Sequence, residues 1–248
     1  YTGEDTLSLH DALPICSGTD ILTLADGINT MSVAGAESVV GGTGADTITF
    51  TAIISGAVLD LGAGADKLTL ANGANTVTLS NLETIVGNSG ADTVVLATAA
   101  SGNSIDLGAG ADKLTLADAN NALTLGNTIE SLVGGTLDDN ITMSAAVSTM
   151  AIDLGAGTDR LVLFNGANTL TISNVETLVA NAGVDTITLG TTVTNQSFDL
   201  AGGIDKLTLS GAGANTLTAA NIETIVGQAG ADTVTLAAAV SGANISLG

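Results

Sequence analysis

A short pattern of alternating apolar residues recurs every eight to eleven residues through almost the whole chain. In one stretch of 46 residues the pattern starts five times, at Asp66, Asn75, Glu83, Asp92 and Asn103. Each copy is a polar residue followed by alternating outward and apolar positions, a period of two that is typical of a half-buried β-strand. Because such a short strand cannot bury its apolar side alone, it must stack on neighbouring copies, and the repeat predicts a solenoid.

A longer period of 46 or 47 residues groups these copies into five units that fill residues 17–248. Three sets of acidic residues keep this register: Asp20, Asp66, Asp112, Asp159 and Asp205; Asp46, Asp92, Asp139, Asp185 and Asp232; and Glu37, Glu83, Glu130, Glu176 and Glu223. We therefore predict an all-β fold, a parallel β-roll or β-solenoid of short strands at about nine-residue spacing, as a single domain over residues 17–248.

The first sixteen residues lack this pattern and hold the only tyrosine, histidine, proline and cysteine of the chain. Residues 1–15 resemble the translation of a widely used sequencing adapter, and Cys16 aligns with a repeat glycine, Gly108. We expect residues 1–16 to be a non-native segment and residues 17–248 to be a fragment of a longer repeat protein. The alternative is a genuine leader, although the segment has neither the basic start nor the long apolar core of a secretory signal.

The chain is strongly acidic, with 25 acidic and 4 basic residues and a net charge of −21. This balance argues against a nucleic-acid partner, which needs a basic surface, and against an anionic membrane surface. No apolar run is long enough to span a bilayer, so we expect no membrane insertion. Hydrophobic residues make up 45% of the chain but aromatics only 2%, which favours a core of stacked aliphatic side chains.

Glycine-rich turns precede many of the acidic residues, as in Gly41-Gly-Thr-Gly-Ala-Asp46. Turn carbonyls and carboxylates are the hard oxygen ligands that calcium prefers, six to eight at roughly 2.3–2.6 Å. Stacking at about 4.8 Å would bring like charges together, at roughly 3 kcal/mol per pair for an effective dielectric near 20. Bound divalent cations are the simplest remedy; the alternative is a solvated acidic edge without a specific metal.

The calcium ligands that we predict are acidic residues at the turns: Asp46, Asp66, Asp92, Asp112, Asp139, Asp159, Asp185, Asp205, Asp232, Glu83, Glu130, Glu176 and Glu223. A second acidic set stands at outward strand positions, where solvation is the simpler interpretation: Asp60, Asp106, Asp153 and Asp199.

The turn that ends at Asp46 resembles the calcium-binding nonapeptide of the haemolysin-type, or RTX, repeat family, Gly-Gly-x-Gly-x-Asp-x-apolar-x. The resemblance extends in rhythm over residues 17–248, although Asn75 stands where the motif has aspartate, and the turn before Glu83 has no glycine. It implies a parallel β-roll with calcium between the turns of adjacent coils. It also implies a secreted or cell-surface bacterial protein, such as an adhesin or surface-layer protein, exported by type I secretion.

Two arrangements of the turns are open at this level. In a coil of two strands, successive turns alternate between two edges, which places Asp46, Asp66 and Glu83 together on one edge and Asp92, Asp112 and Glu130 on the other. In coils of alternately 26 and 20 residues, every glycine-rich aspartate turn would share one edge. We favour the first arrangement, because equal coils keep the strands in register.

We expect a non-enzymatic, extracellular structural or adhesive segment that folds on binding calcium after export. Its partners would be calcium ions, other copies of the chain or cell-surface components. The alternative is a metal-independent solenoid that acts as a binding or surface-layer scaffold. Ice binding is less favoured, because the outward threonine rows are interrupted. An enzyme is disfavoured because the single histidine, His10, lies in the adapter-like segment.

Overall fold

The computed structural model describes residues 13–14, 19–237 and 242–248, and it is built entirely of β-strands, turns and loops there. The prediction of an all-β solenoid is confirmed: every described strand pairing is parallel, and the paired strands are next but one to each other in the sequence. The expected non-native segment lies outside the described residues except for β1 (Leu13–Pro14), which pairs with β3. The described residues contain no helix of the length and apolarity that a membrane span needs.

The chain forms two compact units. The first runs to Ala97 and includes Asn103–Asp112, and the second comprises Thr98–Gly102 and Lys113–Gly248.

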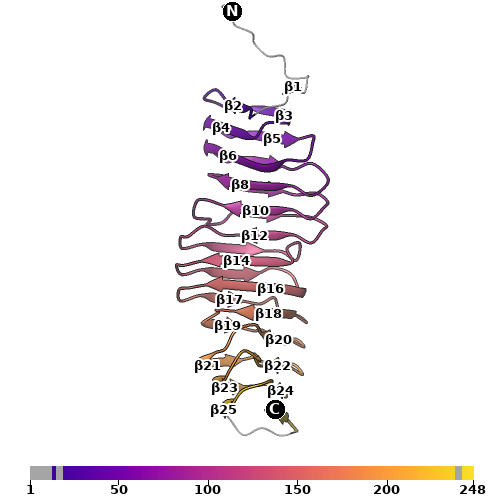
Figure 1. Cartoon of the computed structure of the whole chain (residues 1–248), viewed down its shortest axis with the longest axis vertical. Coiled ribbons are helices and arrows are strands. Elements are labelled where there is room, and N and C mark those ends of the chain that lie inside the picture. Colours follow the sequence, from indigo (N-terminus) through magenta and orange to yellow (C-terminus); the bar gives the residue numbers. More distant parts are fainter. Residues whose placement is uncertain (1–12, 15–18, 238–241) are drawn as a thin grey trace, which may run out of the picture. The chain divides into compact units, whose positions relative to one another are not determined.

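In the first unit, even-numbered and odd-numbered strands form separate sheets. The even sheet holds β2 (Ile21–Thr23), β4 (Ser38–Thr43), β6 (Ser55–Ala63), β8 (Thr76–Ser80) and β10 (Thr93–Leu96). The odd sheet holds β1, β3 (Thr30–Ala34), β5 (Thr47–Phe50), β7 (Lys67–Thr69), β9 (Thr84–Val86) and β11 (Ser104–Asp106). Figure 1 shows β4 and β6 running in the opposite direction to β5.

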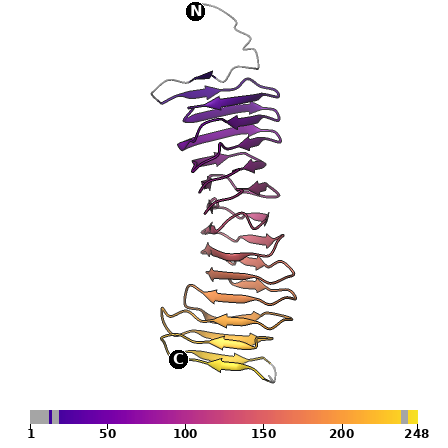
Figure 2. The same cartoon turned by 90° about the vertical axis from the view of Figure 1, so that its right-hand side faces the viewer.

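The second unit repeats this plan. Its even sheet holds β12 (Lys113–Thr115), β14 (Ser131–Gly135), β16 (Ser148–Gly155), β18 (Thr169–Ser173), β20 (Thr186–Leu189), β22 (Lys206–Thr208), β24 (Thr224–Val226) and β26 (Asn244–Ser246). Its odd strands form two shorter sheets, first β13 (Ala122–Leu125), β15 (Asn140–Met143), β17 (Arg160–Val162) and β19 (Thr177–Val179), then β21 (Thr194–Asp199), β23 (Thr216–Ala220) and β25 (Thr233–Leu236). Figure 2 shows the strands of successive coils in each unit lying one above another.

The core of each unit is a set of mainly aliphatic columns between the even-numbered and the odd-numbered strands. Strand register stacks Ile48 on Leu68 and Leu68 on Ile85, and all three side chains are at most 1% exposed. The alternating pattern of the sequence therefore places one apolar column per inward position. The outward rows are mixed, since Thr78 lies beside Val95 and Thr186 lies beside Lys206.

Replacing a column residue should weaken the fold far more than replacing an outward one. We expect Leu68→Ala to cost about 2–5 kcal/mol, because a fully buried side chain leaves a cavity between fixed neighbours. Val58 is 54% exposed on the outer face of β6, and Val58→Ala should change stability by less than about 0.5 kcal/mol. Urea unfolding of the full chain measures both; equal shifts in the two variants would contradict this assignment of inner and outer faces.

Candidate functional site

Polar side chains connect the turns of successive coils along each edge. In the first unit the backbone N–H of Asn29 donates to Asp46 Oδ1 at 2.8 Å, and that of Asp46 donates to Asp66 Oδ1 at 2.7 Å. The N–H of Asp66 then donates to Glu83 Oε2 at 2.8 Å. We call such a run, in the order Asn, Asp, Asp, Glu, a carboxylate ladder. Each step satisfies an amide that precedes a strand and therefore lies outside the strand pairing.

The same order recurs along the chain. The further ladders are Asn75–Asp92–Asp112 in the first unit, and Asn121–Asp139–Asp159–Glu176, Asn168–Asp185–Asp205–Glu223 and Asn215–Asp232 in the second. One shorter step joins the N–H of Asp20 to Glu37 Oε2. Glu130 directly precedes β14, at the position that Glu83 has before β9.

Successive ladders occupy different edges within each unit. The ladder from Asn29 to Glu83 precedes the odd strands β3 to β9, whereas Asn75 and Asp92 precede the even strands β8 and β10. Steps along a ladder span 17 to 20 residues, one two-stranded coil. The favoured arrangement with alternating edges is therefore confirmed, and coils of alternately 26 and 20 residues do not occur in either unit.

The ladder aspartates lie under the turns rather than at an open edge. Eight of them are at most 1% exposed: Asp46, Asp66, Asp92, Asp112, Asp139, Asp159, Asp185 and Asp205. The glutamates are more accessible; Glu83 and Glu176 are exposed, and Glu37, Glu130 and Glu223 are half-buried. Sequence reasoning placed all of these residues at turns but could not give their depth. The structure thus offers buried carboxylates with a more accessible glutamate at the end of a ladder.

Seven of these buried aspartates use one carboxylate oxygen and leave the other unused. The second oxygen, Oδ2, is buried and accepts no hydrogen bond in Asp46, Asp66, Asp92, Asp139, Asp159, Asp185 and Asp205. A buried polar atom without a partner costs about 1–3 kcal/mol, and more when it carries charge. Lys67 directly follows Asp66, but its side chain is exposed on the outward side of the strand. These oxygens therefore need a proton or a cation.

Turn carbonyls also approach the carboxylates at the Asp–Asp steps. A methyl group at Gly64 would lie 2.2 Å from the Gly44 carbonyl oxygen and 2.9 Å from Asp66 Oδ1. The two oxygens belong to the two turns of an Asp–Asp step, and neither can donate a hydrogen to the other. Only glycine fits here, because any Cβ would collide with the carbonyl.

This convergence recurs at all four Asp–Asp steps. The glycine, carbonyl and carboxylate oxygens are Gly64, Gly44 O and Asp66 Oδ1; Gly110, Gly90 O and Asp112 Oδ1; Gly157, Leu137 O and Asp159 Oδ1; and Gly203, Gly183 O and Asp205 Oδ1. A further carbonyl faces the unused oxygen of a first aspartate, since a methyl group at Gly134 would lie 2.2 Å from Leu154 O and 2.6 Å from Asp139 Oδ2.

The second aspartate of a ladder is the most perturbed electrostatically. Burial raises the pKa of Asp159 to about 6, and the Glu176, Asp139 and Asp138 carboxylates add to this, although the hydrogen bond from the Asp139 amide opposes it. Burial likewise raises the pKa of Asp66 and of Asp205. Each of these carboxyl groups lies between an aspartate on one coil and a glutamate on the next, so its charged form is disfavoured from both sides.

The asparagines that begin the ladders have a role that sequence reasoning missed. The Nδ2 amide of Asn75 donates to the carbonyl oxygens of Ala71 and Gly73 in its own turn and to Asp92 Oδ1 on the next coil, at 2.7–2.9 Å. Asn29, Asn121, Asn168 and Asn215 each make the corresponding three bonds. The signal in the sequence was the regular replacement of the motif aspartate by asparagine.

The outward acidic set is also hydrogen-bonded. Asp60 Oδ1 accepts from Asn81 Nδ2 at 2.8 Å, and Asp153 and Asp199 accept in the same way from Asn174 and Asn221. Asp106 Oδ1 accepts from the amide of Gly108. All four aspartates are exposed, which fits the expectation of a solvated position, and the bonds of Asp60, Asp153 and Asp199 link neighbouring coils at the surface.

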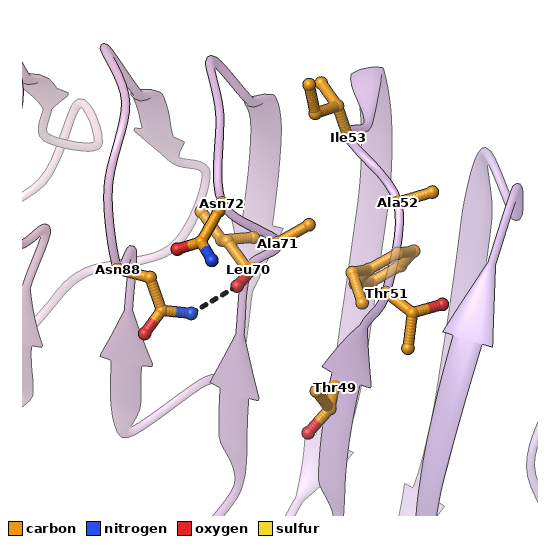
Figure 3. Close-up of a pocket in the computed structure, with 9 residues that line it drawn as sticks. Thr49, Thr51, Ala52, Ile53, Leu70, Ala71, Asn72 and Asn88 are labelled. Atoms are coloured by element: carbon orange, nitrogen blue, oxygen red, sulfur yellow. Dashed lines mark hydrogen bonds between the residues drawn. The ribbon is translucent and has the colours of Figure 1, made fainter.

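A cavity of about 500 Å³ lies beside the loop that follows β5. Figure 3 shows Ile53 and Ala52 on one side and Asn72 and Asn88 on the other. The two asparagines are already engaged: Asn88 Nδ2 donates to Leu70 O at 2.6 Å, and Asn72 Oδ1 accepts from the Ser89 hydroxyl at 2.9 Å. The ladders are therefore the stronger candidate site.

The oxygen atoms of the ladders suit a hard cation that is held by few carboxylates and several carbonyls. Within the described residues, no three His, Cys, Asp or Glu side chains gather around one point. A cation at an Asp–Asp step would therefore take two carboxylates and complete its shell with turn carbonyls, which calcium accepts readily. The buried, unused oxygens and the converging carbonyls fit such an ion.

No protein-family model, curated protein or solved structure matches the chain. The chain is therefore classified by its fold alone, which is the architecture of a β-solenoid repeat protein.

Raised aspartate pKa values give a definite sign for the effect of pH. The folded chain holds a proton on Asp159 up to pH of about 6, whereas an unfolded chain releases it near pH 3.8. With a metal chelator present, we expect the thermal midpoint to fall as the pH rises from about 4 to about 6. Asp159→Asn should flatten part of this slope, whereas Asp106→Asn should not. A midpoint that rises over this interval in the parent chain would contradict the assignment.

Proposed function

We propose that the chain is a calcium-stabilised structural segment of a secreted or cell-surface protein, in which cations at the Asp–Asp steps lock successive coils together. The observations that carry this proposal are the buried second oxygens of seven of the paired aspartates, which accept no hydrogen bond, and the turn carbonyls that approach a carboxylate oxygen at each Asp–Asp step. The ladder carboxylates are buried and hydrogen-bonded rather than lining a cleft, which supports a role without catalysis.

At one step, Asp46 and Asp66 with the carbonyl of Gly44 would hold the ion. The corresponding steps are Asp92 with Asp112, Asp139 with Asp159, and Asp185 with Asp205. The glutamates at the ladder ends and Asp232 are further candidate ligands at the periphery. A bound calcium ion would neutralise the buried carboxylates and occupy the unused oxygens.

Calcium would then be coupled to folding. Each site is made by two coils, so it exists only in the stacked chain, and binding free energy becomes folding free energy. The net charge of −21 opposes compaction until cations bind. Such a chain would stay unfolded at the low calcium concentration inside a cell and fold outside it. Such coupling would suit a chain that is exported and then takes part in adhesion or surface-layer assembly.

A second candidate is a metal-independent binding or surface-layer scaffold. It is favoured by the Oδ1 bonds and asparagine bonds, which connect the coils without any ion. Protonation of the second aspartates, whose pKa values are raised, would then take the place of calcium.

Calcium titration of the full chain separates the two candidates. We expect chelator-treated protein at pH 7.5 to gain β signal in circular dichroism, and its thermal midpoint to rise, as calcium is added. At 100 times the dissociation constant each site should add about 2.7 kcal/mol. Magnesium should do much less, because it demands a stricter octahedral shell. A complete β spectrum and an unchanged midpoint in chelator would favour the metal-independent scaffold.

A further inference from the structure

We propose that the asparagine of each ladder is a built-in substitute for the cation, so that ion binding is confined to the Asp–Asp steps. This inference rests on the proposed function and assigns where in the repeat calcium is used. It predicts four ions for the four Asp–Asp steps, and coil contacts at the asparagine steps that need no metal.

The first argument is the environment of the asparagine amide nitrogen. Asn75 Nδ2 is surrounded by the carbonyl oxygens two and four residues before it and by the Asp92 carboxylate of the next coil. These are the oxygen types that bind calcium. The amide supplies positive hydrogens to all three, so the step needs no further positive charge.

The second argument is the matching environment at an aspartate turn. The carbonyl two residues before Asp92 is Gly90 O, and it converges with Asp112 Oδ1 of the next coil at Gly110. Gly73 O and Asp92 Oδ1 are in the same relation to Asn75. At the aspartate turn, however, the Asp92 side chain has no amide nitrogen to donate to them, and Asp92 Oδ2 is buried without a hydrogen bond.

The third argument is that these two turns have similar backbone conformations at the glycine. Gly73 and Gly90 stand two residues before Asn75 and Asp92, and their φ angles are 114° and 118°. Both glycines are in a region that favours glycine. Asn75 and Asp92 are also successive steps of one ladder, joined by a hydrogen bond of 2.9 Å from the Asn75 amide to Asp92 Oδ1. The exchange of one side-chain nitrogen for an oxygen therefore distinguishes a step without an ion from a step with one.

Two single substitutions exchange the roles. In Asn75→Asp the three oxygens lose their donor and a new Asp–Asp step arises. In Asp92→Asn the new amide can donate to the carbonyls of Asn88 and Gly90 and to Asp112 Oδ1, and one Asp–Asp step disappears. Asn72→Asp is the matched control, because it adds the same charge to an exposed position three residues from Asn75.

Native mass spectrometry of the full chain with calcium, and thermal unfolding with and without chelator, test the inference. We expect four calcium ions in the parent chain, five in Asn75→Asp, three in Asp92→Asn and four in Asn72→Asp. In chelator the midpoint should fall for Asn75→Asp and rise for Asp92→Asn, and calcium should restore Asn75→Asp.

The outcomes distinguish this inference from the proposed function. A parent chain that binds no calcium overturns both. A parent chain that binds calcium while Asn75→Asp and Asp92→Asn keep its stoichiometry overturns only the inference. A fifth ion in Asn72→Asp would also overturn it, because added charge rather than ladder position would then decide binding. If Asn75→Asp fails to fold, the loss of one ion in Asp92→Asn remains decisive.

Discussion

The backbone amide that precedes a strand at the asparagine and aspartate positions sets the central constraint on this fold. This amide lies outside the hydrogen bonding between strands, but the stacking of coils buries it. It must therefore find an acceptor on the next coil. Asp66 Oδ1 is such an acceptor for Asp46, and Glu83 Oε2 serves Asp66. Glutamate has one more methylene than aspartate, and its side chain stays more exposed than the ladder aspartates. The side-chain chemistry of the ladder thus follows from a backbone requirement.

Meeting that requirement with carboxylates creates a second problem. An aspartate has two oxygens, and the amide of the previous coil uses only one of them. The glycine turns then bring carbonyl oxygens toward the carboxylate rather than donors, as at Gly64. Stability therefore depends on what neutralises these sites, and hydrogen bonding within the coil cannot do it alone. The raised pKa of Asp159 has the same origin, because burial disfavours its charged form and the carboxyl group then holds a proton more tightly.

The sequence predicts the architecture well because strand alternation and repeat length are local properties. The inward positions of Leu68 and Ile85 follow from period two, and the odd number of strands per repeat unit predicts the alternation of edges. The depth of Asp66 does not follow, because it depends on how the glycine turn folds over the carboxylate. The role of Asn75 was hidden for a related reason: a motif comparison shows a missing aspartate, whereas the structure shows three donated hydrogen bonds.

The order within a ladder limits the accumulation of buried charge. An unbroken column of aspartates would place like charges about 4.8 Å apart along a whole edge. Here asparagine begins a full ladder, glutamate ends it nearer to solvent, and the next ladder starts on another edge. No more than two buried aspartates are therefore adjacent in any ladder, as with Asp139 and Asp159. A pair of carboxylates matches the charge of one divalent ion, so the repeat divides a large electrostatic cost into steps that single ions can neutralise.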